Sequence, residues 1–330
     1  METSSASAVR QPSRPNLLRG VLIIAVLGAL VLLAVASRDR VQLALGIGYP
    51  ERSAEPMLVI AHRGDLDRYP EDTFEAIEAA ADGSADGIEF DVQRSADGIW
   101  YVLHDDTMDR TTDLSGPVHE LTSTEIDTAT IDGGLGYDTS HVGLGVPRLS
   151  DVLDMLRDYA GSLIVDLQHA AAGDAGEVAG LLDGRPATML VRDVEDIEAI
   201  RAADPGITVV ARQWVAPDLV DGFLMDATTE ATIGRVRGSD LPVWTYVGES
   251  NFSDDETGLI RRAWAADVYA FLSKHPEDAV ETVEGLRDAA RYAAGSAEAG
   301  TGVVLGVGLG VGYADLPSNS RPMGSAKYSM

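Results

Sequence analysis

Short apolar, β-rich runs alternate with amphipathic, alanine-rich stretches along the middle of the chain. We expect the apolar runs to be strands and most of the stretches between them to be helices, because β-branched and aromatic residues favour strands whereas alanine, leucine and glutamate favour helices. The expected strands are residues 57–62, 87–92, 100–104, 162–167, 188–193, 208–212, 222–227, 242–247 and 268–273. The expected helices are residues 73–81, 149–160, 175–184, 194–203, 229–238 and 256–266.

This alternation predicts an α/β fold in which parallel strands are covered by helices. The number of expected strands suits a closed TIM (β/α)8 barrel with one additional strand. A doubly wound open sheet is the alternative, but it would carry a Gly-x-Gly-x-x-Gly turn after its first strand, and residues 62–70 contain no such motif. The connection over residues 105–147 is long for a compact domain, so it indicates a functional loop or an excursion from the barrel.

An uncharged apolar run covers residues 20–36 near the N-terminus. We expect residues 17–37 to be a transmembrane signal anchor, because this run approaches the length that spans a bilayer. Arginines are more numerous before the run than after it, which predicts a single-pass protein of the cell membrane with its larger part outside the cytoplasm. The alternatives are a signal peptide cleaved near Ala36, which would give a secreted protein, and a buried soluble helix.

Composition divides the rest of the chain. We expect residues 1–16 to be a short tail, residues 38–56 a linker, residues 57–296 the barrel domain and residues 297–330 a glycine-rich C-terminal tail. The uncharged segment 301–314 is too short for a spanning helix, so it is either a flexible end or a segment that touches a membrane or a partner.

The charge of the chain limits its partners. The formal net charge is −28, so the phosphate backbone of a nucleic acid would be repelled and nucleic acid is not an expected partner. An anionic substrate would have to be attracted locally, by an arginine or a bound cation. The chain has no cysteine, which excludes disulfides, thiolate catalysis and zinc–thiolate sites.

Polar side chains of catalytic types gather where the first four expected strands end. In a parallel barrel the carboxyl ends of the strands form one face, where active sites lie, so we expect these residues to converge. Side chains two residues apart on a strand point the same way, which pairs the two carboxylates of the second strand. The residues are His62 and Arg63, Glu89 and Asp91, His104, and Asp166 and Gln168.

The types of these side chains predict a particular chemistry. Three converging carboxylates repel one another unless a cation neutralises them, and ligands that are all oxygen select Mg²⁺ or Ca²⁺. Two histidines beside such a cation suit a general acid and a general base, and an arginine binds phosphate oxygens in pairs. Together they indicate metal-assisted phosphoryl transfer.

These positions form a recognisable set of motifs, and through them the sequence resembles the glycerophosphodiester phosphodiesterase family. The resemblance is dense from residue 57 to about residue 168 and thin afterwards. The matching motifs are His62-Arg63-Gly64, Pro70-Glu71-Asp72-Thr73, Glu89-x-Asp91-Val92, Asp97-Gly98, His104-Asp105, Arg110-Thr111-Thr112 with Gly116, and Pro147-x-Leu149.

The resemblance implies a TIM barrel with a small insertion after the third strand. It also implies hydrolysis of glycerophosphodiesters to sn-glycerol 3-phosphate and an alcohol. In the implied site a divalent cation is held by three carboxylates, two histidines act as acid and base, and an arginine binds the phosphate. These residues are Glu89, Asp91 and Asp166 for the metal, His62 and His104 for acid–base catalysis, and Arg63 for the phosphate.

Three further residues bear on substrate binding. The family usually has a lysine where this chain has Gln168, and a glutamine cannot supply that positive charge. Lys274, after the last expected strand, could replace the charge or be an ordinary surface lysine. Trp244 matches a Trp-Thr pair of the family and is expected to wall the substrate cleft.

The sequence therefore favours a membrane-anchored glycerophosphodiester phosphodiesterase whose partners are its small-molecule or lipid-derived substrate and the membrane. Two alternatives stay open. One is a phospholipase D-like lyase that releases cyclic phosphate from lysophospholipids. The other is a catalytically weak surface-binding protein on the same barrel, favoured by the departure at Gln168.

Overall fold

The structure is a computed structural model that describes residues 57–141, 143–168, 171, 173–225, 241–246 and 256–298, with side chains up to residue 291. The expected anchor at 17–37, the linker at 38–56 and the tail beyond residue 298 lie outside this part of the chain. Within the described residues, no helix has the length and apolar character needed to cross a membrane.

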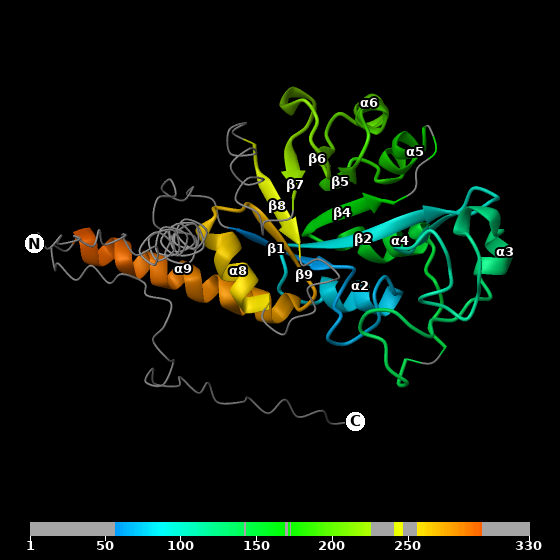
Figure 1. The fold of residues 1–330 in the computed structure, drawn as a ribbon, viewed down its shortest axis with the longest axis horizontal. Coiled ribbons are helices and arrows are strands. Elements are labelled where there is room, and N and C mark those ends of the chain that lie inside the picture. The colour runs from blue at the N-terminus through cyan, green and yellow to red at the C-terminus, as the bar shows by residue number, and fades with distance from the viewer. Residues whose placement is uncertain are drawn as a thin grey trace, which may run out of the picture.

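Eight parallel strands close into a barrel, as predicted. Every neighbouring pair in the ring is parallel, and the ring closes because β1 pairs with both β9 and β2. All these strands lie within or beside the ranges expected from the sequence (Figure 1). They are β1 (Leu58–His62), β2 (Gly87–Arg94), β4 (Ser162–Leu167), β5 (Ala187–Val191), β6 (Thr208–Ala211), β7 (Gly222–Leu224), β8 (Val243–Tyr246) and β9 (Ala270–Ser273).

The remaining strand, β3 (Trp100–Val102), is not part of the barrel. It pairs antiparallel with the last residues of β2, which extends beyond the barrel toward α3 (Ser123–Ile126) in Figure 1. The predicted insertion does follow the third strand of the chain, but this strand belongs to the excursion, so the barrel itself is interrupted after β2. A short apolar run does not reveal whether it continues a barrel or folds back as a hairpin.

The excursion has a small apolar core of its own. It also contains the 3-10 helix η1 (Val118–Glu120), and Thr122 and Glu125 form a reciprocal capping box at the start of α3. This packing explains why so long a connection is ordered beside the barrel. The buried side chains of this core are Tyr101, Leu103, Met108, Val118, Ile126, Ala129, Ile131 and Val146.

Helices cover the outside of the barrel. The first begins after Thr73, whose hydroxyl accepts a hydrogen bond from the Ala76 N–H, as a helix N-cap should. The longest was not expected as a helix, although proline followed by two acidic residues is a helix-start signal. The helices are α2 (Phe74–Ala81), α4 (Leu149–Met155), α5 (Asp174–Leu181), α6 (Val194–Ala203), α8 (Glu256–Ala265) and α9 (Pro276–Glu298), with 3-10 turns η2 (Leu156–Asp158) and η3 (Pro217–Leu219).

The interior of the barrel is a packed apolar layer, separate from the layer between strands and helices. Trp244 belongs to this interior, with 4% of its surface exposed, and its ring lies 5.8 Å from that of Tyr269. The inward-facing residues are Ile60, Ile164, Leu190, Val210, Leu224, Trp244, Ala270 and Leu272. This floor supports the polar side chains that follow at the strand ends.

Candidate active site

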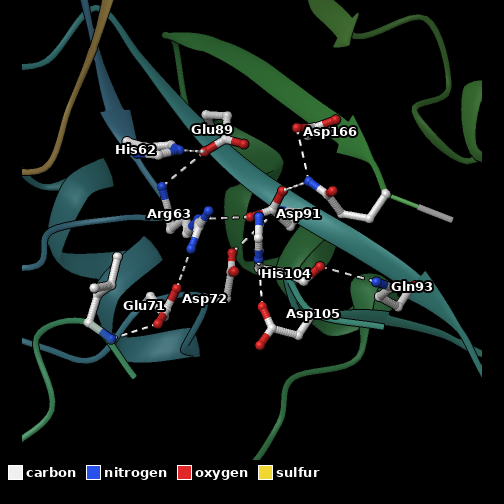
Figure 2. A network of polar contacts seen from close by, with 12 residues as sticks. His62, Arg63, Glu71, Asp72, Glu89, Asp91, Gln93, His104, Asp105 and Asp166 are labelled. Carbon is white, nitrogen blue, oxygen red and sulfur yellow. Dashed lines mark hydrogen bonds and ion pairs between the residues drawn. The ribbon is translucent and has the colours of Figure 1, made fainter. Parts of the chain in front are cut away.

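Three carboxylates meet above the barrel floor. Glu89 and Asp91 come from β2 and Asp166 from β4, and each side chain is almost completely buried. One oxygen from each lies within 4.8 Å of the others. The register of the strands produces this meeting, because Asp91 is the direct partner of Asp166. Figure 2 shows the three carboxylates close together on the neighbouring strands β2 and β4.

Burial of these charges is electrostatically unfavourable unless something compensates for it. Desolvation, together with the charge of Asp91, raises the pKa of Glu89 to about 8. Oδ2 of Asp91 and Oδ1 of Asp166 are buried and accept no hydrogen bond from the described residues. An oxygen-only set in which two buried oxygens accept no hydrogen bond fits a hard divalent cation such as Mg²⁺ or Ca²⁺. The predicted metal ligands thus lie where one cation could reach all three.

His62, the last residue of β1, lies beside this cluster. Its Nε2 is 3.8 Å from Oε2 of Glu89, and its buried Nδ1 has no hydrogen-bond partner among the described residues. Burial lowers the pKa of His62 well below its usual value, and the positive charges of Arg63, Lys274 and Arg212 lower it further. The imidazole is therefore neutral at neutral pH.

The backbone after His62 turns sharply so that the next side chain also reaches the site. Arg63 has a φ of 60° and Gly64 a φ of 93°, and a Cβ on Gly64 would lie 2.6 Å from Ala76. The N–H of Arg63 donates to the backbone oxygen and to Oε2 of Glu89, at 2.9 and 3.0 Å. The glycine of the His-Arg-Gly motif is thus required by the turn.

The guanidinium of Arg63 is held between two carboxylates. Its Nε lies 3.0 Å from Oδ2 of Asp91, and NH1 donates to Glu71. Glu71 also accepts from Arg110 at 2.5 and 3.2 Å and from the N–H of Leu135 at 2.6 Å. Burial alone would raise the pKa of Glu71, but these donors outweigh it and hold the pKa below its ordinary value. Glu71 is therefore the anchor of Arg63.

Asp72 follows Glu71 in the Pro70-Glu71-Asp72-Thr73 motif, and its backbone conformation accounts for the type of this residue. Its φ of 57° lies in the left-handed region, where aspartate and asparagine are tolerated better than other side chains. Its Oδ1 accepts a hydrogen bond of 3.2 Å from the N–H of Asp91. Burial, followed by the charge of Asp91, raises the pKa of Asp72 well above its usual value.

His104 reaches the site by an unexpected route. Because β3 runs antiparallel from the extended end of β2, it returns the chain to the barrel rim, where the N–H of Leu103 donates to the Asp91 carbonyl at 3.0 Å. Nδ1 of His104 is 2.7 Å from Asp105, and Figure 2 shows its ring between Asp105 and Asp91. Arg110 binds Asp105 at 2.6 and 2.9 Å, so the histidine is oriented by a carboxylate that is itself held.

The three expected substrate-binding residues occupy different places. Gln168 lies at the cluster, where its amide N–H groups donate to Asp91 and, at 2.9 Å, to Asp166. Lys274 is not a surface lysine, because only 3% of it is exposed, and its charge acts on His62. Trp244 packs in the barrel interior, whereas Tyr246, two residues later, has its ring 6.4 Å from that of His62.

Two arginines at the site were not identified from the sequence. Arg212 pairs with Asp166, and Arg192 lies 3.6 Å from the same carboxylate and donates to Oε1 of Gln168 at 3.0 Å. Each directly follows a barrel strand: Arg192 comes after β5, and Arg212 comes after β6. The strand-end rule that found His62 and Asp166 would have found both, had it been applied to the fifth and sixth strands.

A cavity of about 1050 Å³ opens beside Gln168. It lies between the end of β2 with the β2–β3 connection, including Arg94 and Asp97, and the residues that follow β4 and β5, including Arg192. Its lining is mainly polar and charged. The lining contains neither the three carboxylates nor His62 and His104, so the cavity adjoins the site only through Gln168 and Arg192.

Comparison with known proteins agrees with this geometry. Residues 62–171 match the model of the glycerophosphoryl diester phosphodiesterase family. A glycerophosphodiester phosphodiesterase of Caldanaerobacter subterraneus is 43% identical over 101 residues, which are 31% of this chain and 41% of that protein. The chain thus aligns with less than half the length of this curated relative.

Solved structures share the fold over a longer range. A glycerophosphodiester phosphodiesterase of Agrobacterium tumefaciens matches with a TM-score of 0.54 and 27% identity, over 67% of this chain and 97% of that one. An Oleispira antarctica phosphodiesterase, solved in complex with the product sn-glycerol-3-phosphate, matches with a TM-score of 0.59 and 20% identity over 70% of this chain and 98% of that one. The segment from His62 to Gln168 thus lies inside the match to the glycerophosphoryl diester phosphodiesterase family, and this part of the chain is similar to members of that family.

Proposed function

We propose that the protein hydrolyses glycerophosphodiesters to sn-glycerol 3-phosphate and an alcohol, with the aid of a divalent cation. The observation that carries this proposal is the meeting of Glu89, Asp91 and Asp166 beside two histidines on one barrel rim. The family match and the named activity of the relatives support it. The polar cavity beside Gln168 offers space for part of the substrate.

The three carboxylates would hold the cation, which as a Lewis acid would polarise a phosphoryl oxygen. The chain's own contribution is to keep these carboxylates converged. Strand register fixes Asp91 opposite Asp166, and the N–H of Arg63 fixes Glu89. Magnesium and calcium are both compatible with this ligand set.

His62 is the proposed general base. A neutral imidazole can take a proton from the attacking hydroxyl as the new P–O bond forms. Attack by water gives glycerol 3-phosphate directly, whereas attack by the neighbouring glycerol hydroxyl gives a cyclic phosphate that water must then open. The lowered pKa of His62 keeps it neutral for this step. Lys274 and Arg212 contribute to that lowering, so both have a role in keeping the base unprotonated.

His104 is the proposed general acid. Its proton would pass to the oxygen of the departing alcohol as the P–O bond to that oxygen breaks. Asp105, held by Arg110, fixes the orientation of the ring through Nδ1. Arg63 is the proposed phosphate ligand, since a guanidinium has five N–H donors and can bind an anion while keeping Glu71 and Asp91.

Phosphorus NMR of the products tests this reaction class. The full chain would be incubated with glycerophosphoglycerol, glycerophosphoethanolamine and a lysophospholipid in the presence of Mg²⁺ or Ca²⁺. The proposal expects the resonance of glycerol 3-phosphate to grow from the glycerophosphodiesters. A cyclic phosphate that accumulates and persists, above all from the lysophospholipid, would instead identify a lyase.

We also propose that residues 17–37 anchor the protein in the cell membrane with the barrel outside the cytoplasm. The support is the uncharged run and the arginines around it in the sequence. Protease added to intact cells should then degrade the barrel. Complete protection until the cells are lysed would mean that the barrel lies inside, and a soluble extracellular barrel would indicate cleavage near Ala36.

A further inference from the structure

Arg212 extends from the end of β6 to a carboxylate on β4. Its backbone N–H donates to the Val191 carbonyl at 2.8 Å, so the start of the side chain is fixed. Its NH1 pairs with Oδ2 of Asp166, and its guanidinium carbon lies 5.6 Å from the centre of the Tyr246 ring. The guanidinium thus has two supports, an anion and an aromatic face.

The position of this arginine brings its positive charge close to any cation at the same carboxylate. Arg212 and Gln168 both contact Oδ2 of Asp166, which leaves Oδ1 for a cation shared with Glu89 and Asp91. Two positive groups at one buried carboxylate repel each other. The guanidinium can satisfy Asp166 without a cation, but it would have to move or share the carboxylate when one binds.

We propose that Arg212 is the counter-ion of Asp166 in the cation-free protein and becomes a ligand of the substrate phosphate once the cation is bound. This rests on the proposed function, because it concerns the same site. The Tyr246 ring would keep the guanidinium at the barrel mouth after the cation has bound Asp166. The same ring lies next to His62.

The comparison with Arg63 explains why Arg212 is suited to this change. The Arg63 side chain is 4% exposed and is tied to both Glu71 and Asp91. The Arg212 side chain is 21% exposed, whereas its partner Asp166 is 2% exposed. A phosphate entering from solvent can therefore reach Arg212, and the shift from a carboxylate to a phosphate preserves the charge-assisted pairing that guanidinium favours.

The proposal predicts that removal of Arg212 changes the affinity for the cation and the affinity for the phosphate in opposite directions. Removing Arg212 takes away a competitor of the cation and a ligand of the phosphate, so cation binding should tighten while phosphate binding weakens. A residue that merely supports the fold of the site would weaken both when removed. This difference in sign separates the two roles.

Isothermal titration calorimetry on the full chain measures both effects. The variants are Arg212→Ala and Arg212→Gln, the second of which keeps a hydrogen-bond donor but no charge. Mg²⁺ should bind about tenfold more tightly to each. With saturating Mg²⁺, sn-glycerol 3-phosphate should bind about tenfold or more weakly. Should Arg212→Ala fail to fold, Arg212→Gln alone carries the test.

Arg157→Ala is the matched control, because Arg157 pairs with Asp154 on the surface and both side chains are well exposed. It should leave both affinities unchanged. Weaker or unaltered Mg²⁺ binding in the Arg212 variants, or unaltered glycerol 3-phosphate binding, would overturn the proposal. If both changes occur but the wild-type chain cleaves no glycerophosphodiester, the proposed function fails while the assignment of Arg212 stands.

Discussion

Asp91 of β2 and Asp166 of β4 are direct partners in the parallel register of their strands, so their carboxylates face one another by virtue of backbone pairing. Glu89, two residues before Asp91, points to the same side of β2. Repulsion between such groups opposes folding of this region, and binding energy from a cation can offset it. The first prediction follows from this arrangement.

Asp91→Asn and Asp166→Asn should each weaken Mg²⁺ binding at least about tenfold, because each keeps the shape of the side chain but removes a charged ligand. Calorimetric titration with Mg²⁺ measures the change. Asp154→Asn, at an exposed aspartate, serves as the control and should bind as the wild type does. Unchanged affinity in both site variants would remove these carboxylates from the metal site.

His62→Ala and His104→Ala should each lower kcat by at least about 100-fold, since each removes a proposed proton-transfer group. Steady-state rates with a glycerophosphodiester test this, and thermal unfolding should show that both variants remain folded. His141→Ala is the control, because His141 contacts Asp138 and the Arg68 carbonyl, away from the carboxylates. Near-normal turnover in either site variant would exclude that histidine from the mechanism.

In the absence of cation, stability should fall as the pH rises from about 4.5 to about 8. The folded-state pKa of Glu89 is raised to about 8 by burial and by Asp91, so the folded protein holds a proton in this range that the unfolded chain releases. The stability that the protonated Glu89 contributes to the folded protein is fully present below pH 4.5 and is lost as the pH rises through about 8. Asp72 adds to the effect, because its pKa is also raised.

Thermal unfolding across this range, in EDTA and in Mg²⁺, measures the effect. The decline should be clear in EDTA, smaller in Mg²⁺, and reduced in Glu89→Gln, which has no charge to desolvate. The lowered pKa of His62 works in the other direction below pH 6.5, so the slope is compared between Glu89→Gln and wild type rather than judged alone. Identical slopes in those two proteins would contradict the account of Glu89.

Glu71→Gln should lower the free energy of unfolding by about 3 kcal/mol, because it removes a buried charge that holds Arg63 and Arg110. Denaturant unfolding measures the loss. Glu78→Gln on the exposed face of α2 is the control and should change stability by less than about 0.5 kcal/mol. If Glu71→Gln also lowered the free energy of unfolding by less than about 0.5 kcal/mol, Arg63 and Arg110 would be held by other groups.

Much of the barrel could be predicted from the sequence because each strand is a short apolar run, and the polar side chains of the candidate site lie within these runs or directly after them. This rule placed His62, Glu89, Asp91 and Asp166 correctly at one rim. The rule also placed Gln168 at this rim, but it did not predict the hydrogen bonds that the Gln168 amide makes to Asp91 and Asp166.

Other features depend on spatial relationships that a linear pattern does not contain. His104 reaches the rim only because β3 folds back on an overlong β2, and that pairing is antiparallel. Lys274 directly follows β9, which pairs with β1, and its near-complete burial is not indicated by the sequence around it. The contact of Arg212 with Asp166 crosses from β6 to β4, so neither residue type nor spacing indicates it.

The central claim is tested most directly by enzyme-coupled detection of glycerol 3-phosphate released by the full chain from glycerophosphodiesters, with Mg²⁺ or Ca²⁺ and then with excess EDTA. The account predicts steady release with the cation, its loss in EDTA and its recovery when the cation is restored. Release that continues undiminished in exhaustive chelator, or no release from any glycerophosphodiester with either cation, would contradict it.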